Sequence, residues 1–129
     1  MKSWKHALSA LGAALVLAGC GGGGGTVITG VKVVGDSLSD SGVFGIKFSM
    51  QGSVSEPMQI WTERLTATYG APKLCPRYGA TSPTTVALNP AATACTSYAV
   101  GGGRINMPTA PSSGFSIPQQ LKDLSNEKA

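Results

Sequence analysis

VKVVGDSLSDSG, at positions 31–42, is the stretch of sequence that decides the expected fold. Residues 31–34 are short, β-branched and bounded by Gly30 and Gly35, which predicts a buried strand. The residues that follow are rich in turn formers and helix-capping types. A strand that ends in Gly-Asp-Ser and turns into a helix places the hydroxyl of Ser37 at the carboxyl end of a sheet, where open α/β sheets bind their ligands.

Two helices are predicted further along the chain. The first covers residues 60–69, because Trp61, Leu65 and Tyr69 recur at i, i+4 and i+8 and form one apolar face. The second is expected to begin at Ser116 as its N-cap, with a proline in its first turn and apolar residues at i, i+4 and i+7.

A second short strand is predicted at residues 98–100, directly before three glycines. Residues 71–94 and 104–114 are irregular in pattern, and we expect them to be loops. Two strands and two or three helices provide too little sheet to bury both faces of a parallel layer. We therefore expect an incomplete α/β domain over residues 31–129.

Composition excludes several classes of protein. The chain has 129 residues, of which 42% are hydrophobic and 12% charged, unlike a highly charged disordered chain. Its net charge of +4 comes from scattered basic residues, so a nucleic-acid interface is not expected. No CxxC pair occurs and the one histidine is His6, so neither a metal site nor a cofactor is expected. The sequence does not indicate an oligomeric state.

The N-terminus has the pattern of a secretory address. Residues 1–19 combine two lysines with a short apolar run, which is typical of a signal peptide. Residues 17–20, LAGC, resemble the lipobox of bacterial lipoproteins, in which the cysteine, here Cys20, carries the lipid anchor. Residues 20–30 would be the anchor and its Gly-rich tether, and Gly21 resembles lipoproteins sent to the outer membrane. The alternative is an ordinary signal peptide in which Cys20 is incidental.

Cys75 and Cys95 are the two other cysteines of the chain. Outside the reducing cytoplasm they are a candidate disulfide, which would close a loop of 95 − 75 = 20 residues. Two free, buried thiols are the alternative.

Ser37 is able to supply both a nucleophile and one oxyanion donor, its own backbone N–H. The three glycines at 101–103 offer a second N–H that no side chain covers. Residues 35–39 do not form the G-x-S-x-G elbow of α/β-hydrolases, and no Walker A loop occurs. Spacing alone favours a capped turn at residues 35–37 and an ordinary glycine loop at residues 101–103 over a catalytic site, and leaves the function undecided.

Residues 33–42, VVGDSLSDSG, resemble the first block of the GDSL (SGNH) family of esterases and lipases. Residues 97–103, SYAVGGG, resemble its second block, often written Asn-Tyr-Ala-Val-Gly-Gly-Ala. The resemblance covers about residues 31–125 and only the N-terminal portion of a typical family domain. It implies a flavodoxin-like, three-layer α/β/α domain with a parallel sheet, truncated after the second block.

The resemblance also implies roles for individual residues. Ser37 matches the nucleophile, and the N–H groups of Ser37 and Gly102 match two oxyanion donors. Asp40 matches an aspartate that we expect to brace the turn by hydrogen bonding, and not to be the triad acid. Ser97 stands where the second block often has Asn, a departure that bears on the local support of the Gly102 loop.

The family's Gly-x-Asn-Asp and Asp-x-x-His blocks, which supply the third oxyanion donor, the acid and the base, have no counterpart here. We therefore expect the N-terminal portion of a lipid-anchored carboxylic ester hydrolase, with an ester or lipid substrate, that is inactive as this chain stands. The alternative is a non-catalytic envelope lipoprotein that acts as a binding or interaction module. Completion in trans by a second polypeptide is a third option.

Overall fold

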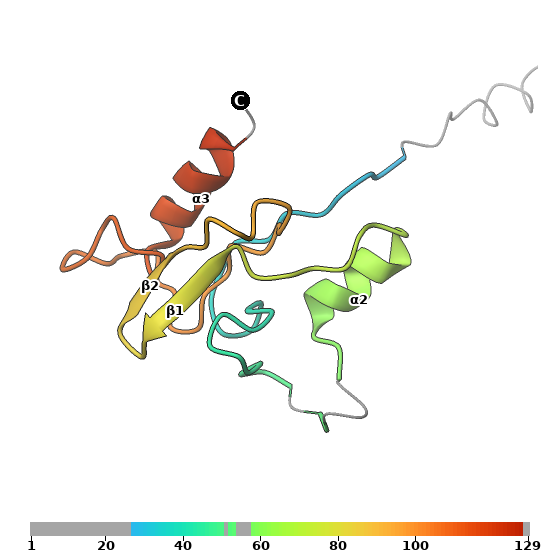
Figure 1. Cartoon of the computed structure of the whole chain (residues 1–129), viewed down its shortest axis with the longest axis horizontal. Coiled ribbons are helices and arrows are strands. Elements are labelled where there is room, and N and C mark those ends of the chain that lie inside the picture. Colours follow the sequence, from blue (N-terminus) through green and yellow to red (C-terminus); the bar gives the residue numbers. More distant parts are fainter. Residues whose placement is uncertain (1–26, 51, 54–57, 128–129) are drawn as a thin grey trace, which may run out of the picture.

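The sheet of this protein is a two-stranded antiparallel hairpin (Figure 1). The computed structural model describes residues 27–50, 52–53 and 58–127. Their elements in chain order are helix α2 (Trp61–Thr68), strand β1 (Tyr78–Ser82), strand β2 (Thr85–Leu88) and helix α3 (Ile117–Asn126). The predicted signal peptide, the anchor at Cys20 and the glycines of the tether lie outside the described residues.

The expected three-layer α/β/α domain with a parallel sheet is wrong for the described chain. The sheet there has two strands, and they are antiparallel. Residues 31–34 and 98–100 form no strands: Val33 makes an isolated parallel bridge with Ser97, and its carbonyl accepts a hydrogen bond from the N–H of Tyr98 at 2.7 Å. The pairing stays short because Gly35 takes a positive φ of 147° and leads the chain into a turn.

The prediction of a loop at residues 71–94 is also wrong, because both strands lie within it. Ala80 pairs with Val86, and a two-residue turn, Pro83 and Thr84, joins the strands. Proline is favoured at the first central position of a type I turn, and the β-branched residues after it suit a strand. These signals are present in the sequence, but the surrounding Pro, Ser and Thr residues are typical of loops and favoured the wrong prediction.

Both predicted helices are confirmed, α2 within residues 60–69 and α3 with Ser116 as its N-cap. The apolar face of α2 is not buried, since Trp61, Leu65 and Tyr69 are exposed. The residues of α2 that are buried are Thr62, Glu63 and Thr66.

Local hydrogen bonds explain how the polar face of α2 is buried. Glu63 Oε2 accepts a hydrogen bond from the backbone N–H of Ile60 at 2.9 Å and pairs with Lys47 Nζ at 2.7 Å. Thr66 Oγ1 donates to the carbonyl of Thr62 at 2.7 Å. Buried polar groups are tolerated where they are hydrogen-bonded, which accounts for the burial of Glu63 and Thr66, whereas the buried hydroxyl of Thr62 has no partner among the described residues.

Two apolar clusters make up the core. The larger contains the buried residues Val43, Tyr78, Val86, Tyr98 and Val100. The smaller contains Val33, Leu74 and Ala99. Residues 98–100 therefore contribute alternately to the two clusters, as an extended backbone requires.

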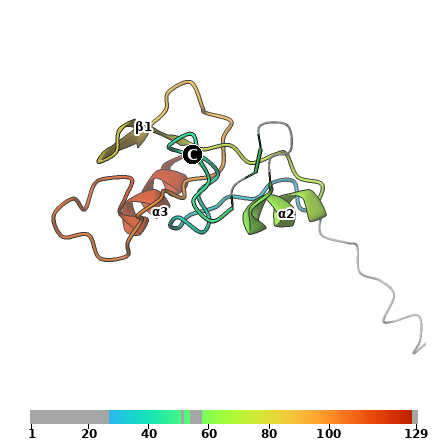
Figure 2. The same ribbon diagram turned by 90° about the horizontal axis from the view of Figure 1, so that it is seen from below.

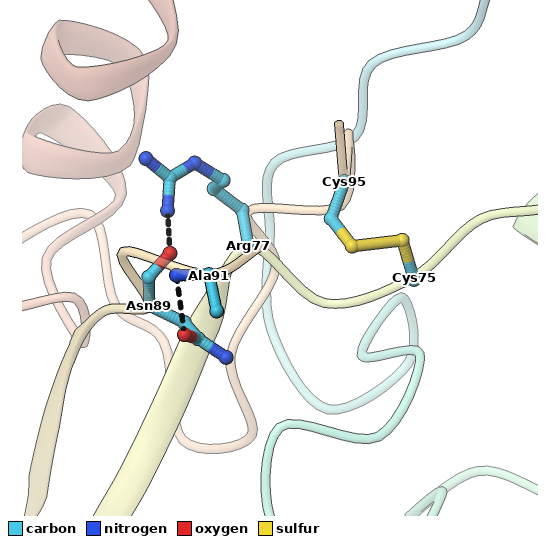
Figure 3. Close-up of a disulfide and its surroundings, with 5 residues drawn as sticks. All are labelled: Cys75, Arg77, Asn89, Ala91 and Cys95. Atoms are coloured by element: carbon cyan, nitrogen blue, oxygen red, sulfur yellow. Dashed lines mark hydrogen bonds between the residues drawn. A yellow bond between two sulfur atoms is a disulfide. The ribbon is translucent and has the colours of Figure 1, made fainter. Parts of the chain in front are cut away.

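Cys75 and Cys95 form a disulfide, as the sequence predicts, with their Cα atoms 4.9 Å apart (Figure 3). Beside it, Arg77 donates from Nη1 to the carbonyl oxygen of Asn89 at 2.5 Å, and Asn89 Oδ1 accepts from the N–H of Ala91 at 3.0 Å. The disulfide and these bonds hold both ends of the hairpin segment together.

The end of α3 is tied to the core by two buried tyrosines. Tyr78 donates its hydroxyl to Asp123 at 2.5 Å, and Tyr98 donates to Glu127, which also pairs with Arg77 at 2.6 Å. Burial raises the pKa of both tyrosines well above the usual value, and the hydrogen bond to a carboxylate adds to each shift. Burial opposes ionisation of Glu127, but the hydrogen bonds from Tyr98 and Arg77 outweigh it and lower the pKa of Glu127.

The shifted tyrosines predict a loss of stability in alkali. Above pH about 10 the unfolded chain ionises its tyrosines, whereas Tyr78 and Tyr98 in the folded chain stay protonated. The folded state then binds more protons, so its free energy of unfolding falls as pH rises. Each residue contributes up to about 1.4 kcal/mol per pH unit.

Urea unfolding measured from pH 8 to 11 checks this expectation. Tyr78→Phe should reduce the alkaline slope by about half, since one of the two shifted groups is removed. Tyr69→Phe is the matched control, because that side chain is exposed on α2, and it should leave the slope unchanged. An unchanged slope in Tyr78→Phe would contradict the assignment.

Candidate functional site

Ser37 lies in a tight turn that follows Gly35. The N–H of Ser39 donates to the carbonyl of Asp36 at 3.0 Å, and the side chain of Asp36 accepts from the N–H of Leu38 at 3.0 Å. Ser37 is partly buried. The expected helix after this turn is wrong, because residues 40–50 are turns and bends. A helix dipole therefore does not contribute at Ser37.

Asp40 joins the turn to the triple-glycine segment. Its carboxylate is fully buried, and Oδ1 accepts hydrogen bonds from the N–H groups of Gly42 and Val43, both at 2.8 Å. These two bonds confirm the predicted bracing of the turn. Oδ2 accepts a third bond, at 2.7 Å, from the N–H of Gly101, which the sequence did not predict.

The two motif segments are in direct backbone contact. The N–H of Val100 donates to the carbonyl oxygen of Gly35 at 3.1 Å. A Cβ atom at position 103 would lie 2.6 Å from that same oxygen, so only glycine fits there. The structure thus brings the Gly35 turn and residues 101–103 together.

Two backbone donors at this junction are unpaired. Within residues 27–50, 52–53 and 58–127, neither the N–H of Ser37 nor that of Gly102 donates a hydrogen bond. Gly102 adopts a φ of +85°, a conformation that favours glycine. Unpaired N–H groups at a partly exposed turn are what stabilisation of an oxyanion requires.

Gln120 is a site residue that the sequence analysis missed. Its fully buried side chain accepts from the N–H of Gly35 at 2.8 Å and donates to the carbonyls of Gly35 at 3.0 Å and Gly114 at 2.8 Å. Its position three residues after Ile117 and four before Leu124 places it on the apolar face of α3. That placement was a signal, since a polar residue on a buried face needs specific partners.

Ser97 supports the glycine segment through its backbone only. Its N–H donates to the carbonyl of Cys75 at 3.1 Å, and its own carbonyl accepts from the N–H of Arg77 at 2.7 Å. Its buried hydroxyl makes no hydrogen bond in the described part of the chain. The side chain therefore gives the Gly102 loop no polar support.

A cavity of about 780 Å³ opens beside the glycine segment. It is lined by residues 43–46 and Phe48, by residues 80–83 of the hairpin, and by Gly101 and Gly102. Phe44 and Phe48 pack edge to face in this lining, with ring centroids 5.7 Å apart. The cavity is in the size range of small-molecule sites, and its aromatic side suits an apolar ligand.

No base contacts the Ser37 hydroxyl in the described part of the chain. Among the same residues, no group of three or more His, Cys, Asp or Glu side chains is placed to hold a metal ion. None of the helices described has the length and apolar character needed to cross a bilayer.

No family model, curated protein or solved structure matches this chain. The resemblance of residues 33–42 and 97–103 to the GDSL blocks therefore remains a prediction from those residues.

Asp40→Asn should destabilise the protein by about 3 kcal/mol, because the amide keeps one acceptor and leaves buried N–H groups without partners. Asp36→Asn is the matched control, with one exposed bond to Leu38, and should change stability by less than about 1 kcal/mol. Urea unfolding at pH 7 measures both. Equal losses would show that Asp40 does not hold the two segments together.

Gln120→Ala should also reduce the free energy of unfolding by about 3 kcal/mol, because the N–H of Gly35 loses its partner in a buried site. Gln119→Ala removes the neighbouring residue, which bonds only to Asp123 within α3, and should have an effect of about 0.5 kcal/mol. Amide exchange at Gly35 provides a second measurement: protection should fall in Gln120→Ala and persist in Gln119→Ala.

Proposed function

We propose that residues 31–103 carry the nucleophile and the oxyanion donors of a serine ester hydrolase, anchored to the bacterial envelope through Cys20. The observation that supports this best is the Asp40 bridge to the N–H of Gly101. It brings the Ser37 turn beside the glycine segment, at a junction where the N–H groups of Ser37 and Gly102 are unpaired among the described residues. The two sequence motifs supply the reaction class.

In the proposed reaction, Ser37 Oγ attacks the ester carbonyl carbon while its proton passes to a base. The carbonyl π electrons move to oxygen, which the N–H groups of Ser37 and Gly102 stabilise. The carbonyl then re-forms, the ester C–O bond breaks, and the alcohol leaves with a proton. Water hydrolyses the acyl-serine to the carboxylic acid and free Ser37. Removal of one such donor typically lowers the rate about 10² to 10³-fold.

The base is the part of this reaction that the described residues do not provide. A neutral serine is a poor nucleophile until a positioned base takes its proton. The one histidine, His6, lies in the predicted signal peptide. Asp36 and Asp40 are unsuitable, because each carboxylate accepts hydrogen bonds from backbone N–H groups and neither is bonded to the Ser37 hydroxyl. Negligible hydrolysis by this chain alone follows.

Imidazole added to the chain tests the proposal. Without imidazole, we expect no hydrolysis of p-nitrophenyl butyrate that depends on Ser37. With imidazole, we expect a small increase above the imidazole background that saturates with ester. The increase stays small because a free base lacks the effective molarity of a positioned one, about 10⁵ M or more.

Ser37→Ala should abolish the imidazole-dependent increase. Ser41→Ala is the matched control, since Ser41 lies in the same segment and its buried hydroxyl makes no hydrogen bond in the described chain, and it should retain the increase. An increase that persists in Ser37→Ala would overturn the assignment of the nucleophile. Hydrolysis that depends on Ser37 without imidazole would overturn the claim that the base is absent.

A non-catalytic binding module is the second candidate function. The observations in its favour are the absence of a base at the Ser37 hydroxyl in the described residues and the cavity at Gly101 and Gly102, whose lining does not include Ser37. The imidazole experiment separates the two candidates, because a binding module gives no Ser37-dependent turnover at any imidazole concentration.

A further inference from the structure

Helix α2 exposes apolar residues along one side. Trp61, Leu65 and Tyr69, here called the α2 stripe, are 56%, 39% and 48% exposed. Their spacing of four residues places them on one side of the helix, away from the buried residues Thr62 and Thr66. Surface helices normally bury such a stripe and expose the polar face. The reversed arrangement indicates that a partner covers the α2 stripe.

The described chain does not supply that partner. In this part of the protein, α2 packs against none of the other helices and strands. Figures 1 and 2 both place α2 at one end of the molecule, with α3 and the β1–β2 hairpin toward the other end. The α2 stripe is therefore available to an external surface.

The residue types of the α2 stripe favour a lipid surface. Tryptophan and tyrosine have apolar rings with a polar atom, and they concentrate at the interfacial layer of bilayers. The charged residues of α2 are Glu63 and Arg64. Glu63 is buried and paired with Lys47, whereas Arg64 is exposed. The exposed charge of α2 is therefore positive, which suits anionic lipid headgroups.

The path of the chain brings the same end of the protein toward a membrane. The blue segment that begins the described chain lies at the α2 end of the molecule in both views (Figures 1 and 2). Cys20, the proposed lipid anchor, precedes Val27 by 27 − 20 = 7 residues. Seven residues reach at most about 25 Å. An anchor at Cys20 therefore holds the α2 end, rather than the α3 end, close to the bilayer.

We propose that the α2 stripe lies in the interfacial layer of an anionic lipid bilayer. This inference rests on the proposed anchoring of the chain at Cys20 and is independent of the hydrolase chemistry. The stripe fixes the orientation of the anchored protein, with α2 toward the lipid and α3 away from it.

Trp61 reports on its own contact with lipid. The chain contains two tryptophans, Trp4 and Trp61, so the full chain carrying Trp4→Phe has Trp61 as its one tryptophan. Its emission is measured with vesicles of phosphatidylcholine, with and without phosphatidylglycerol, and with brominated acyl chains. We expect a blue shift and quenching by the brominated lipid, both stronger with phosphatidylglycerol and weaker in high salt.

Variants of the stripe are tested in the same Trp4→Phe chain. Leu65→Ser combined with Tyr69→Ser should reduce the quenching of Trp61. Both side chains are exposed, so the double variant should keep its fold, which far-ultraviolet circular dichroism verifies. Leu121→Ser on α3 is the matched control, because that leucine is also exposed, and it should leave the quenching unchanged.

Other outcomes overturn the inference. Vesicles that carry the protein without quenching Trp61 would show that the chain is anchored but that the stripe faces elsewhere. A blue shift that grows with protein concentration in the absence of lipid would show that a second copy covers the stripe. Cys20→Ser separates the two proposals. If Trp61 is quenched equally in Cys20→Ser and in the parent chain, the α2 stripe contacts lipid, and the proposal that an anchor at Cys20 holds it there is contradicted.

Discussion

The buried carboxylate of Asp40 is the constraint on which the rest of the site depends. A buried charge is tolerated only when hydrogen bonds replace the water it loses, and here three backbone N–H groups do so. Two of them belong to the same turn and the third to Gly101, which is 61 residues away in the sequence. The turn and the glycine segment cannot separate without breaking one of the three hydrogen bonds to the buried carboxylate. Gln120 secures the same junction from a third direction by bonding both backbone groups of Gly35.

The sequence predicted local structure better than architecture. Both helices follow from the spacing of apolar residues and from the N-cap at Ser116. Which face of α2 is buried did not follow from that spacing. Glu63 and Thr66 have hydrogen-bond partners within the helix and beside it, so they are buried in place of the apolar residues. Periodicity identifies a stripe but not the side on which the core lies.

The parallel sheet failed as a prediction for a different reason. A short β-branched segment predicts extended backbone, and residues 31–34 and 98–100 do lie beside each other through Val33 and Ser97. Whether such a pair extends into a sheet depends on contacts between distant residues, which no local pattern contains. In the site, the positions of Ser37, Asp40 and the three glycines could be predicted from the motifs, whereas the bond from Asp40 to Gly101 and the role of Gln120 required the structure.

The disulfide couples the folding of this protein to its redox environment. The N–H of Ser97 donates to the carbonyl of Cys75, and the N–H of Arg77 donates to the carbonyl of Ser97. Val33 also pairs with Ser97, so the cross-link lies where three segments meet, those that contain Val33, Cys75 and Ser97. While both thiols are reduced, the entropy of a 20-residue loop opposes that meeting. The reduced chain is therefore expected to be looser around Ser97, and oxidation of the two thiols closes the loop and stabilises this junction.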